Sequence, residues 1–143
     1  MADEYRVEQV EKIDDAIWGA IGGGIQNYND EKAGVDNGKR LCFAIFDKDG
    51  QVAGGVIGIT YWNWLYIDLM WIKEDLRAQG YGSRLLTLAE AEARTRGAQH
   101  AYLDTFSFQA PEFYKKQGYQ VFGELRDFPP GHQRYFLTKE LSG

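Results

Sequence analysis

The chain has 143 residues, a length at which one domain can bury most of its apolar surface without disulfides or metals. Hydrophobic residues make up 44% of it and charged residues 26%, which is ordinary for a soluble globular protein. The net charge of −5 argues against a nucleic acid or an anionic membrane as partner, and mildly favours a cationic substrate. We therefore expect a single domain over residues 1–143.

Cysteine and histidine usage adds further expectations. The single cysteine, Cys42, excludes an intrachain disulfide and fits a reducing compartment, and its apolar neighbours Leu41 and Phe43 predict a buried, unreactive thiol. His100 and His132 lack metal-ligand spacing with each other or with Cys42. No signal peptide is evident, and no apolar run approaches the about 20 residues of a membrane span. These features predict a cytoplasmic protein with no metal and no membrane partner.

The N-terminal third carries a weak strand pattern and then a helical one. Residues 5–10 alternate weakly and predict an edge strand. Over residues 11–33 apolar side chains share one helix face, and Asp14 and Asp15 suit a first turn. Three consecutive glycines at 22–24 predict a break or bend, because each glycine costs a helix interior about 1 kcal/mol.

Three strands are predicted next. Residues 41–47 and 51–61 form a hairpin around a strong turn signal at 47–50. Gly54, Gly55 and Gly58 inside the second strand predict close packing against another backbone. Residues 65–72 are a β-branched and aromatic run, which predicts a buried central strand.

A glycine-containing loop joins this strand to a helix. The loop reads Arg77-Ala-Gln-Gly-Tyr-Gly-Ser-Arg84, apolar residues then recur at helical spacing, and Gly97 supplies a C-terminal stop. Gly80 and Gly82 let backbone N–H groups approach a ligand, and the helix N-terminus adds partial positive charge. The loop therefore predicts an anion site, most simply a phosphate site.

Two common phosphate loops do not fit this stretch. A dinucleotide-binding fingerprint requires glycine where Leu85 stands, and a P-loop requires Gly-Lys-Ser/Thr after a four-residue gap. The spacing of Arg77, Gly80 and Gly82 matches Arg/Gln-x-x-Gly-x-Gly/Ala instead. This pattern resembles the pyrophosphate-binding loop of the GNAT superfamily of N-acetyltransferases, which bind acetyl-CoA.

A second motif strengthens the resemblance. The stretch Ala110-Pro-Glu-Phe-Tyr-Lys-Lys-Gln-Gly-Tyr119 is similar to the GNAT signature Ala-x-x-Phe-Tyr, followed by a basic stretch and Gly-Phe/Tyr. The two motifs stand in the family's order, with a strand-like segment at 101–106 between them. The resemblance runs from about Leu41 to the C-terminus and is weak in the N-terminal third.

The order of elements predicts an α+β fold, completed by a hairpin of residues 119–125 and 133–137. The resemblance implies a GNAT-like fold, with a central mixed, mostly antiparallel sheet flanked by helices and splayed at its middle strands to hold acetyl-CoA. In this family the N-terminal region builds much of the substrate pocket. The glycines at 22–24 are therefore either a mobile segment over the substrate cleft or a plain turn between helices.

The resemblance also implies cofactor-binding residues. Main-chain groups of Met70, Trp71 and Ile72 would pair with the pantetheine of acetyl-CoA where the strands part. Ser107 stands where the family commonly has asparagine, and its hydroxyl would make the same backbone-bridging contact. The pyrophosphate would bind the glycine-containing loop through Arg77, Ala78, Gln79, Gly80, Tyr81, Gly82 and Ser83.

Two residues are expected to act in catalysis. By resemblance Tyr114 is the general acid, because a phenol with a pKa of ~10 can protonate the departing CoA thiolate. A protonated acceptor amine, with a pKa of ~10.4, must lose a proton before it attacks. Asp68 is the expected base, direct or through water, because a carboxylate in an apolar strand needs a partner or a purpose. Asp104 and Glu74 are its competitors.

Two functional classes follow. The first is an acetyl-CoA-dependent N-acetyltransferase, monomer or homodimer, acting on a primary amine of a small molecule or a peptide. The second is a non-catalytic acyl-CoA-binding module or sensor on the same fold. Tyr114 and Asp68 together favour the enzyme, since a sensor needs neither. At least one aromatic residue is expected to form an apolar wall for the acceptor, the candidates being Trp62, Trp64, Phe106 and Phe108.

Overall fold

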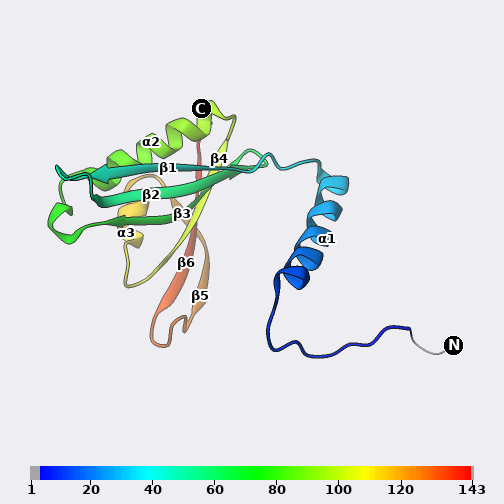
Figure 1. Ribbon diagram of the computed structural model, residues 1–143. Helices are drawn as coiled ribbons and strands as arrows, with labels where there is room; N and C mark the ends of the chain where they lie inside the picture. The colour runs from blue at the N-terminus through cyan, green and yellow to red at the C-terminus, as the bar shows by residue number, and fades with distance from the viewer. Residues whose placement is uncertain (1–3, 143) are drawn as a thin grey trace. The chain divides into compact units, whose positions relative to one another are not determined.

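The computed structural model describes residues 4–142, and the contacts within the chain divide it into two compact units. The first unit ends at Asp36 and contains one helix, α1 (Asp15–Ala33). The second begins at Asn37 and contains a six-stranded sheet with the remaining helices (Figure 1). Every residue predicted to bind the cofactor or to act in catalysis belongs to the second unit.

The sheet is mixed and mostly antiparallel, as the sequence and the resemblance imply. Its strands pair in the order β1-β2-β3-β4-β6-β5, and only β3 and β4 run parallel. The expected α+β class is therefore confirmed. The elements of the second unit are β1 (Lys39–Phe46), β2 (Val52–Tyr61), β3 (Trp64–Ile72), the 3-10 helix η1 (Glu74–Leu76), α2 (Tyr81–Thr95), β4 (His100–Phe106), α3 (Pro111–Lys116), β5 (Gln120–Arg126) and β6 (Gln133–Glu140).

One face of this sheet carries the core of the second unit. Successive strand residues point to opposite faces, so Leu65 and Ile67 of β3 are buried together with Leu103 of β4. The same cluster includes Leu86 from α2 and Tyr114 from α3. Both helices therefore cover this face, and they fix the loop before α2 and the tyrosine of α3 against one layer of strands.

Two expectations for the first unit are wrong. Residues 5–10 form no strand, because weak alternation alone supplies no pairing partner. The glycines at 22–24 lie inside α1, which continues through them without a break. Helix propensity is a weak prior, and here it does not end the helix. The first turn is as expected: Asp14 is the N-cap, and its carboxylate accepts a hydrogen bond from the N–H of Ile17 at 2.9 Å.

The predicted turn between β1 and β2 is confirmed. Between β1 and β2 the carboxylate of Asp47 accepts hydrogen bonds from the N–H groups of Asp49 and Gln51, at 2.8 and 2.9 Å. Between β2 and β3 the chain reverses at Trp62 and Asn63, which both have positive φ. That conformation matches the right-handed twist of the paired strands.

The three glycines of β2 pack as predicted. A Cβ on Gly54, Gly55 or Gly58 would lie only 2.9, 2.8 or 2.8 Å from a backbone oxygen of a neighbouring strand.

The expectation for Cys42 is wrong, because its side chain is exposed. Its apolar neighbour Leu41 is buried, and adjacent strand residues point to opposite faces, so the burial of one predicts exposure of the other.

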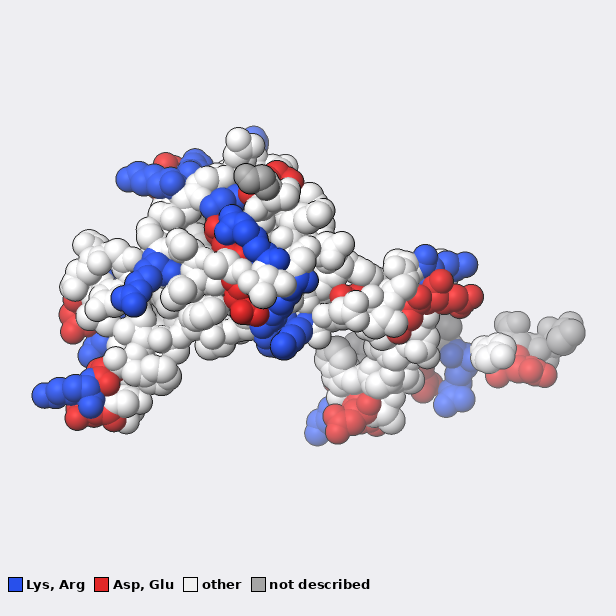
Figure 2. All heavy atoms as spheres, turned by 90° about the horizontal axis from the view of Figure 1, so that it is seen from above, with Lys and Arg blue, Asp and Glu red and all other residues white. Residues whose placement is uncertain are grey.

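The surface carries both signs of charge. On the face shown in Figure 2, basic and acidic side chains are interspersed. Within residues 4–142, no helix has both the length and the apolar character needed to cross a membrane.

Candidate active site

The parallel strands β3 and β4 separate partway along their length. Their pairing runs from Trp64 with His100 to Ile67 with Leu103. Beyond that point β3 continues to Ile72 and β4 to Phe106 without a pairing between them. Both strand ends line a cavity of about 910 Å³, together with the loop before α2 and the start of α3. The predicted splay of the middle strands is therefore present.

One wall of the cavity is the start of α2. Gly80 is the N-cap residue with φ +86°, a left-handed conformation that favours glycine, and the helix begins at Tyr81. The first N–H groups of a helix have no partners within it, and those of the first turn here belong to residues that line the cavity. This wall suits a phosphate group.

Two side chains of the loop hydrogen-bond to backbone oxygens just before it. Arg77 donates from Nε to the carbonyl oxygen of Ile72 at 2.9 Å, and Gln79 donates from Nε2 to the carbonyl oxygen of Asp75 at 2.9 Å. The carbonyl of Ile72, a predicted pantetheine contact, is therefore already an acceptor for Arg77. Gly82 has a second role, since a Cβ there would lie 3.0 Å from Cζ of Phe113 in α3.

All predicted site residues except Gln79 and Ser107 line the cavity. Ser107 instead connects the end of β4 to the start of β6. Its N–H donates to the carbonyl oxygen of Gln133 at 2.8 Å, and its hydroxyl accepts from the N–H of Gln133 at 3.1 Å. The glutamate competitor, Glu74, is exposed on η1 and does not line the cavity.

A further part of the cavity lining is Tyr114 of α3. Pro111 opens α3, where its missing N–H costs nothing, and the helix presents the tyrosine to both the core and the cavity. Burial raises the pKa of the Tyr114 hydroxyl, and the charge of Asp104 adds to the rise. The hydroxyl is therefore protonated at neutral pH, as an ordinary tyrosine also is.

Two carboxylates lie just past the last paired residues, one on each strand. Asp68 follows Ile67 on β3, and Asp104 follows Leu103 on β4, so they occupy neighbouring positions where the strands part. Both line the cavity. The structure thus brings the expected base and its competitor together, on the side of the gap opposite the core.

Three partners of these carboxylates are absent from the sequence-based site. Arg40 donates from Nη1 to Asp68 at 2.9 Å. Arg134 donates to Asp104 from Nε at 3.0 Å and from Nη2 at 2.8 Å, and the hydroxyl of Tyr66 donates to the same carboxylate at 3.1 Å. Burial, followed by the charge of Asp104 and that hydrogen bond, raises the pKa of Tyr66 to about 12.

Of these three partners, the local sequence could have predicted one but not the other two. Tyr66 stands two residues before Asp68 in the same predicted strand, so it shares a face with the site by simple alternation. Arg40 and Arg134 lie 28 and 30 residues from their carboxylates along the chain. Only the pairing order of the strands brings them there, and a single sequence does not reveal that order.

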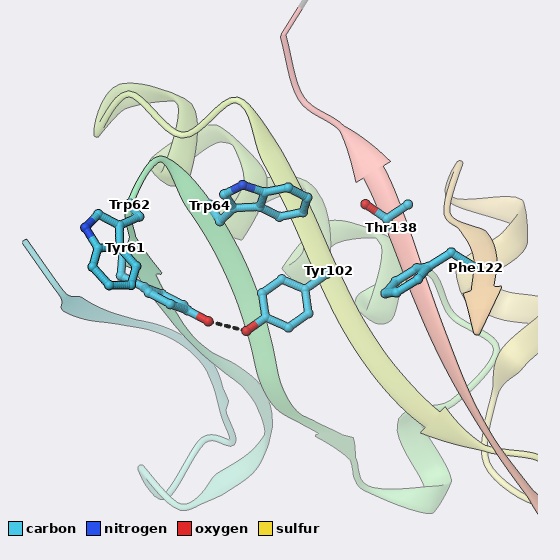
Figure 3. Close-up of a pocket in the computed structure, with 6 residues that line it drawn as sticks. All are labelled: Tyr61, Trp62, Trp64, Tyr102, Phe122 and Thr138. Atoms are coloured by element: carbon cyan, nitrogen blue, oxygen red, sulfur yellow. Dashed lines mark hydrogen bonds between the residues drawn. The ribbon is translucent and has the colours of Figure 1, made fainter. Parts of the chain in front are cut away.

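The four aromatic candidates separate into two groups. Phe108 lines the cavity and stacks on Phe106, with ring centroids 5.4 Å apart. Trp62 and Trp64 lie at the other end of the parallel pair, in a pocket of about 550 Å³ that also contains Tyr102 (Figure 3). Phe108 is therefore the residue of this set placed to contact an acceptor in the cavity.

One cavity thus combines a gap between parallel strands, a helix start that suits a phosphate group and a buried tyrosine. The chain matches the acetyltransferase (GNAT) family over residues 7–119. It therefore belongs to the GNAT acetyltransferase family, and the resemblance of its two motifs is confirmed.

Individual relatives agree with this assignment. The chain is 43% identical over 93 residues to blasticidin-S acetyltransferase of Streptomyces morookaense, which covers 64% of this chain and 68% of that protein. A crystal structure of an acetyltransferase from Bacillus cereus has a TM-score of 0.85 and 35% identity, covering 93% of this chain and 97% of that one. A Bacillus anthracis protein solved with acetyl coenzyme A is 19% identical, with a TM-score of 0.62 over 71% of this chain and 62% of that one, and shares the fold.

Proposed function

We propose that this acetyltransferase moves an acetyl group from acetyl-CoA to a primary amine of a small molecule or peptide by direct attack. The observation that carries the proposal is the composition of one cavity. It joins a helix start that suits an anion, a length of β3 that is not paired with β4, a buried protonated tyrosine and two carboxylates. The name of the Streptomyces relative gives blasticidin S as its acceptor, which supports a small-molecule acceptor here. We place the reaction in the cytoplasm.

Acetyl-CoA fits the residues of the cavity. The pyrophosphate would bind N–H groups at the start of α2, where Gly80 has the left-handed backbone conformation and Gly82 packs closely against Phe113. The pantetheine would lie beside Met70 and Trp71, in the place of a strand paired with β3. Ser107 contributes indirectly, because its two backbone contacts hold the end of β4.

The chemistry then follows from the two walls. Asp68 takes a proton from the acceptor ammonium, and the freed nitrogen attacks the thioester carbonyl carbon. A carbon–nitrogen bond forms while the carbon–sulfur bond breaks. The departing thiolate takes the proton of the Tyr114 hydroxyl, which is protonated at neutral pH. The nitrogen then loses its second proton, which restores the Tyr114 hydroxyl, and the proton held by Asp68 passes to solvent. An acetylated amine and free coenzyme A leave the site.

A screen for thiol release tests the proposal. The protein is incubated with acetyl-CoA and a panel of amines, polyamines, aminoglycosides and peptides, and we expect thiol release with at least one class. Binding of acetyl-CoA without thiol release from any amine would instead support the non-catalytic module.

The cofactor position has its own test. Gly82→Asp adds negative charge beside the proposed pyrophosphate site and also crowds Phe113, whereas Gly82→Ala only crowds Phe113, so calorimetry should show coenzyme A binding weakened far more by Asp than by Ala. Unchanged affinity in a folded variant would show that the loop does not bind the cofactor.

A further inference from the structure

The two carboxylates of the cavity are held in different ways. Asp104 receives two hydrogen bonds from one guanidinium, both at Oδ1, and a third at Oδ2 from the hydroxyl of Tyr66. Its side chain is 16% exposed and that of Arg134 is 28% exposed. The guanidinium centre also lies 5.5, 5.2 and 5.2 Å from the ring centres of Phe106, Phe128 and Phe136. These three hydrogen bonds and the aromatic rings around the guanidinium fix the orientation of the pair.

Asp68 has a much looser partner. Arg40 reaches it through one hydrogen bond, from Nη1 to Oδ2 at 2.9 Å. The side chain of Arg40 is 62% exposed, against 34% for Asp68, and it comes from the edge strand β1, two strands away from β3. Exposed single-bond ion pairs of this kind add little to stability, so Arg40 can leave at small cost.

We propose that Arg40 is the exchangeable counter-ion of Asp68, and that the ammonium group of a cationic acceptor takes its place. This inference rests on the proposed function and names the acceptor class, a primary amine that arrives protonated. The exchange leaves the charge at Asp68 balanced, because one cation replaces another. Asp104 keeps Arg134 throughout, so the cavity does not lose its second charge pair.

The same exchange accounts for product release. Acetylation converts the ammonium into a neutral amide, with its proton passed to Asp68 and then to solvent. The product then has no charge to offer the carboxylate, and the guanidinium of Arg40 returns to it. Arg40 is in this view a specificity-determining residue, competing with substrate before the reaction and with product after it.

The decisive variant is Arg40→Gln, which removes the competing charge. We expect the KM for a cationic acceptor to fall roughly 2–5-fold, the factor that corresponds to losing an exposed ion pair. The KM for acetyl-CoA should not change. Arg40→Lys keeps the charge and should stay near the parent protein. Arg126→Gln is the matched control, because Arg126 is exposed in the same unit and faces Glu124 at 3.9 Å.

Three results would overturn the proposal. The first is an unchanged or raised acceptor KM in folded Arg40→Gln. The second is a fall in the acceptor KM of Arg126→Gln as large as that of Arg40→Gln. The third is a preference of the parent protein for amines that are neutral at the assay pH. If the parent protein releases no thiol with any amine, the proposed function fails, and calorimetry with 1,4-diaminobutane decides the exchange. Tighter binding to Arg40→Gln than to the parent would support it, and equal or weaker binding would overturn it.

Discussion

Tyr114 combines two properties that suit its proposed role as an acid, a fixed position in the core and contact with the cavity. It is buried against Phe113 and Tyr119, with ring centres 5.1 and 6.2 Å away, and still lines the cavity. A tyrosine that served packing alone would need no contact with the cavity. One that served acid chemistry alone would not need to be in the core. The packing therefore fixes the position of the hydroxyl.

Replacing Tyr114 with Phe separates these roles. The ring and its packing remain, so the melting temperature and coenzyme A affinity should stay close to the parent values. Loss of the proton donor should lower kcat by about 10²–10⁴-fold, the usual contribution of a general acid. Steady-state kinetics on the best acceptor of the screen measures this. A variant with nearly the parental kcat would make Tyr114 a packing residue, or thiolate departure a fast step.

Among the elements, α2, α3 and β6 are tied together by a polar network in the core. Glu90 of α2 accepts hydrogen bonds from the Tyr119 hydroxyl at 3.0 Å and from Nζ of Lys139 at 2.8 Å. The same ammonium donates to the carbonyl oxygen of Gln117, whose side chain donates to the hydroxyl of Ser83 at 2.7 Å. This network joins the cofactor loop to the helix of Tyr114.

Glu90→Gln should therefore destabilise the fold. It removes a buried negative charge and leaves the Lys139 ammonium without a charged partner, which costs about 1–3 kcal/mol. Glu112→Gln is the control, because that carboxylate pairs with Lys115 at 3.0 Å on the surface. Urea unfolding should show a clear loss for Glu90→Gln and almost none for Glu112→Gln. Equal midpoints would mean that the network adds nothing to stability.

Strand glycines offer a second comparison among elements. An alanine at Gly58 would place its Cβ 2.8 Å from the carbonyl oxygen of Tyr66, and overpacking of this kind costs about 1–3 kcal/mol. At Gly123 of β5 the nearest atom would be Cβ of Phe136 at 3.8 Å, an ordinary contact. Thermal unfolding should show a lower melting temperature for Gly58→Ala and no loss for Gly123→Ala. The reverse order would contradict the close pairing of β2 with β3.

At the scale of the whole molecule, features with local causes were predictable from the sequence. The turn at Asp47, the glycine-containing loop and the helix that follows this loop each depend on residues adjacent in the chain. Features set by the pairing of strands were not predictable from the sequence. The exposure of Cys42 and the guanidinium partners of the two carboxylates depend on which strands become neighbours, and on which face each side chain points to.

The division into two units gives a prediction for the whole chain. All buried core residues within 4–142 lie between Leu41 and Leu141, so a chain that begins at Asn37 should fold alone. Circular dichroism and thermal unfolding of this shortened chain should show a mixed α and β spectrum and a cooperative transition. The expectation of one domain over residues 1–143 stays a prediction. A shortened chain that does not fold would support it.

Where β3 and β4 separate, each strand has an open edge facing the other, in the middle of the sheet. Open edges normally invite pairing with any extended chain, and this one is bounded on both sides by strands of the same sheet. Under the proposed function, acetyl-CoA completes the sheet, so its binding raises the free energy of unfolding by mass action. In cells rich in acetyl-CoA the protein would thus be more stable against unfolding than in starved cells. Purification without coenzyme A would leave the unpaired edges of β3 and β4 prone to aggregation.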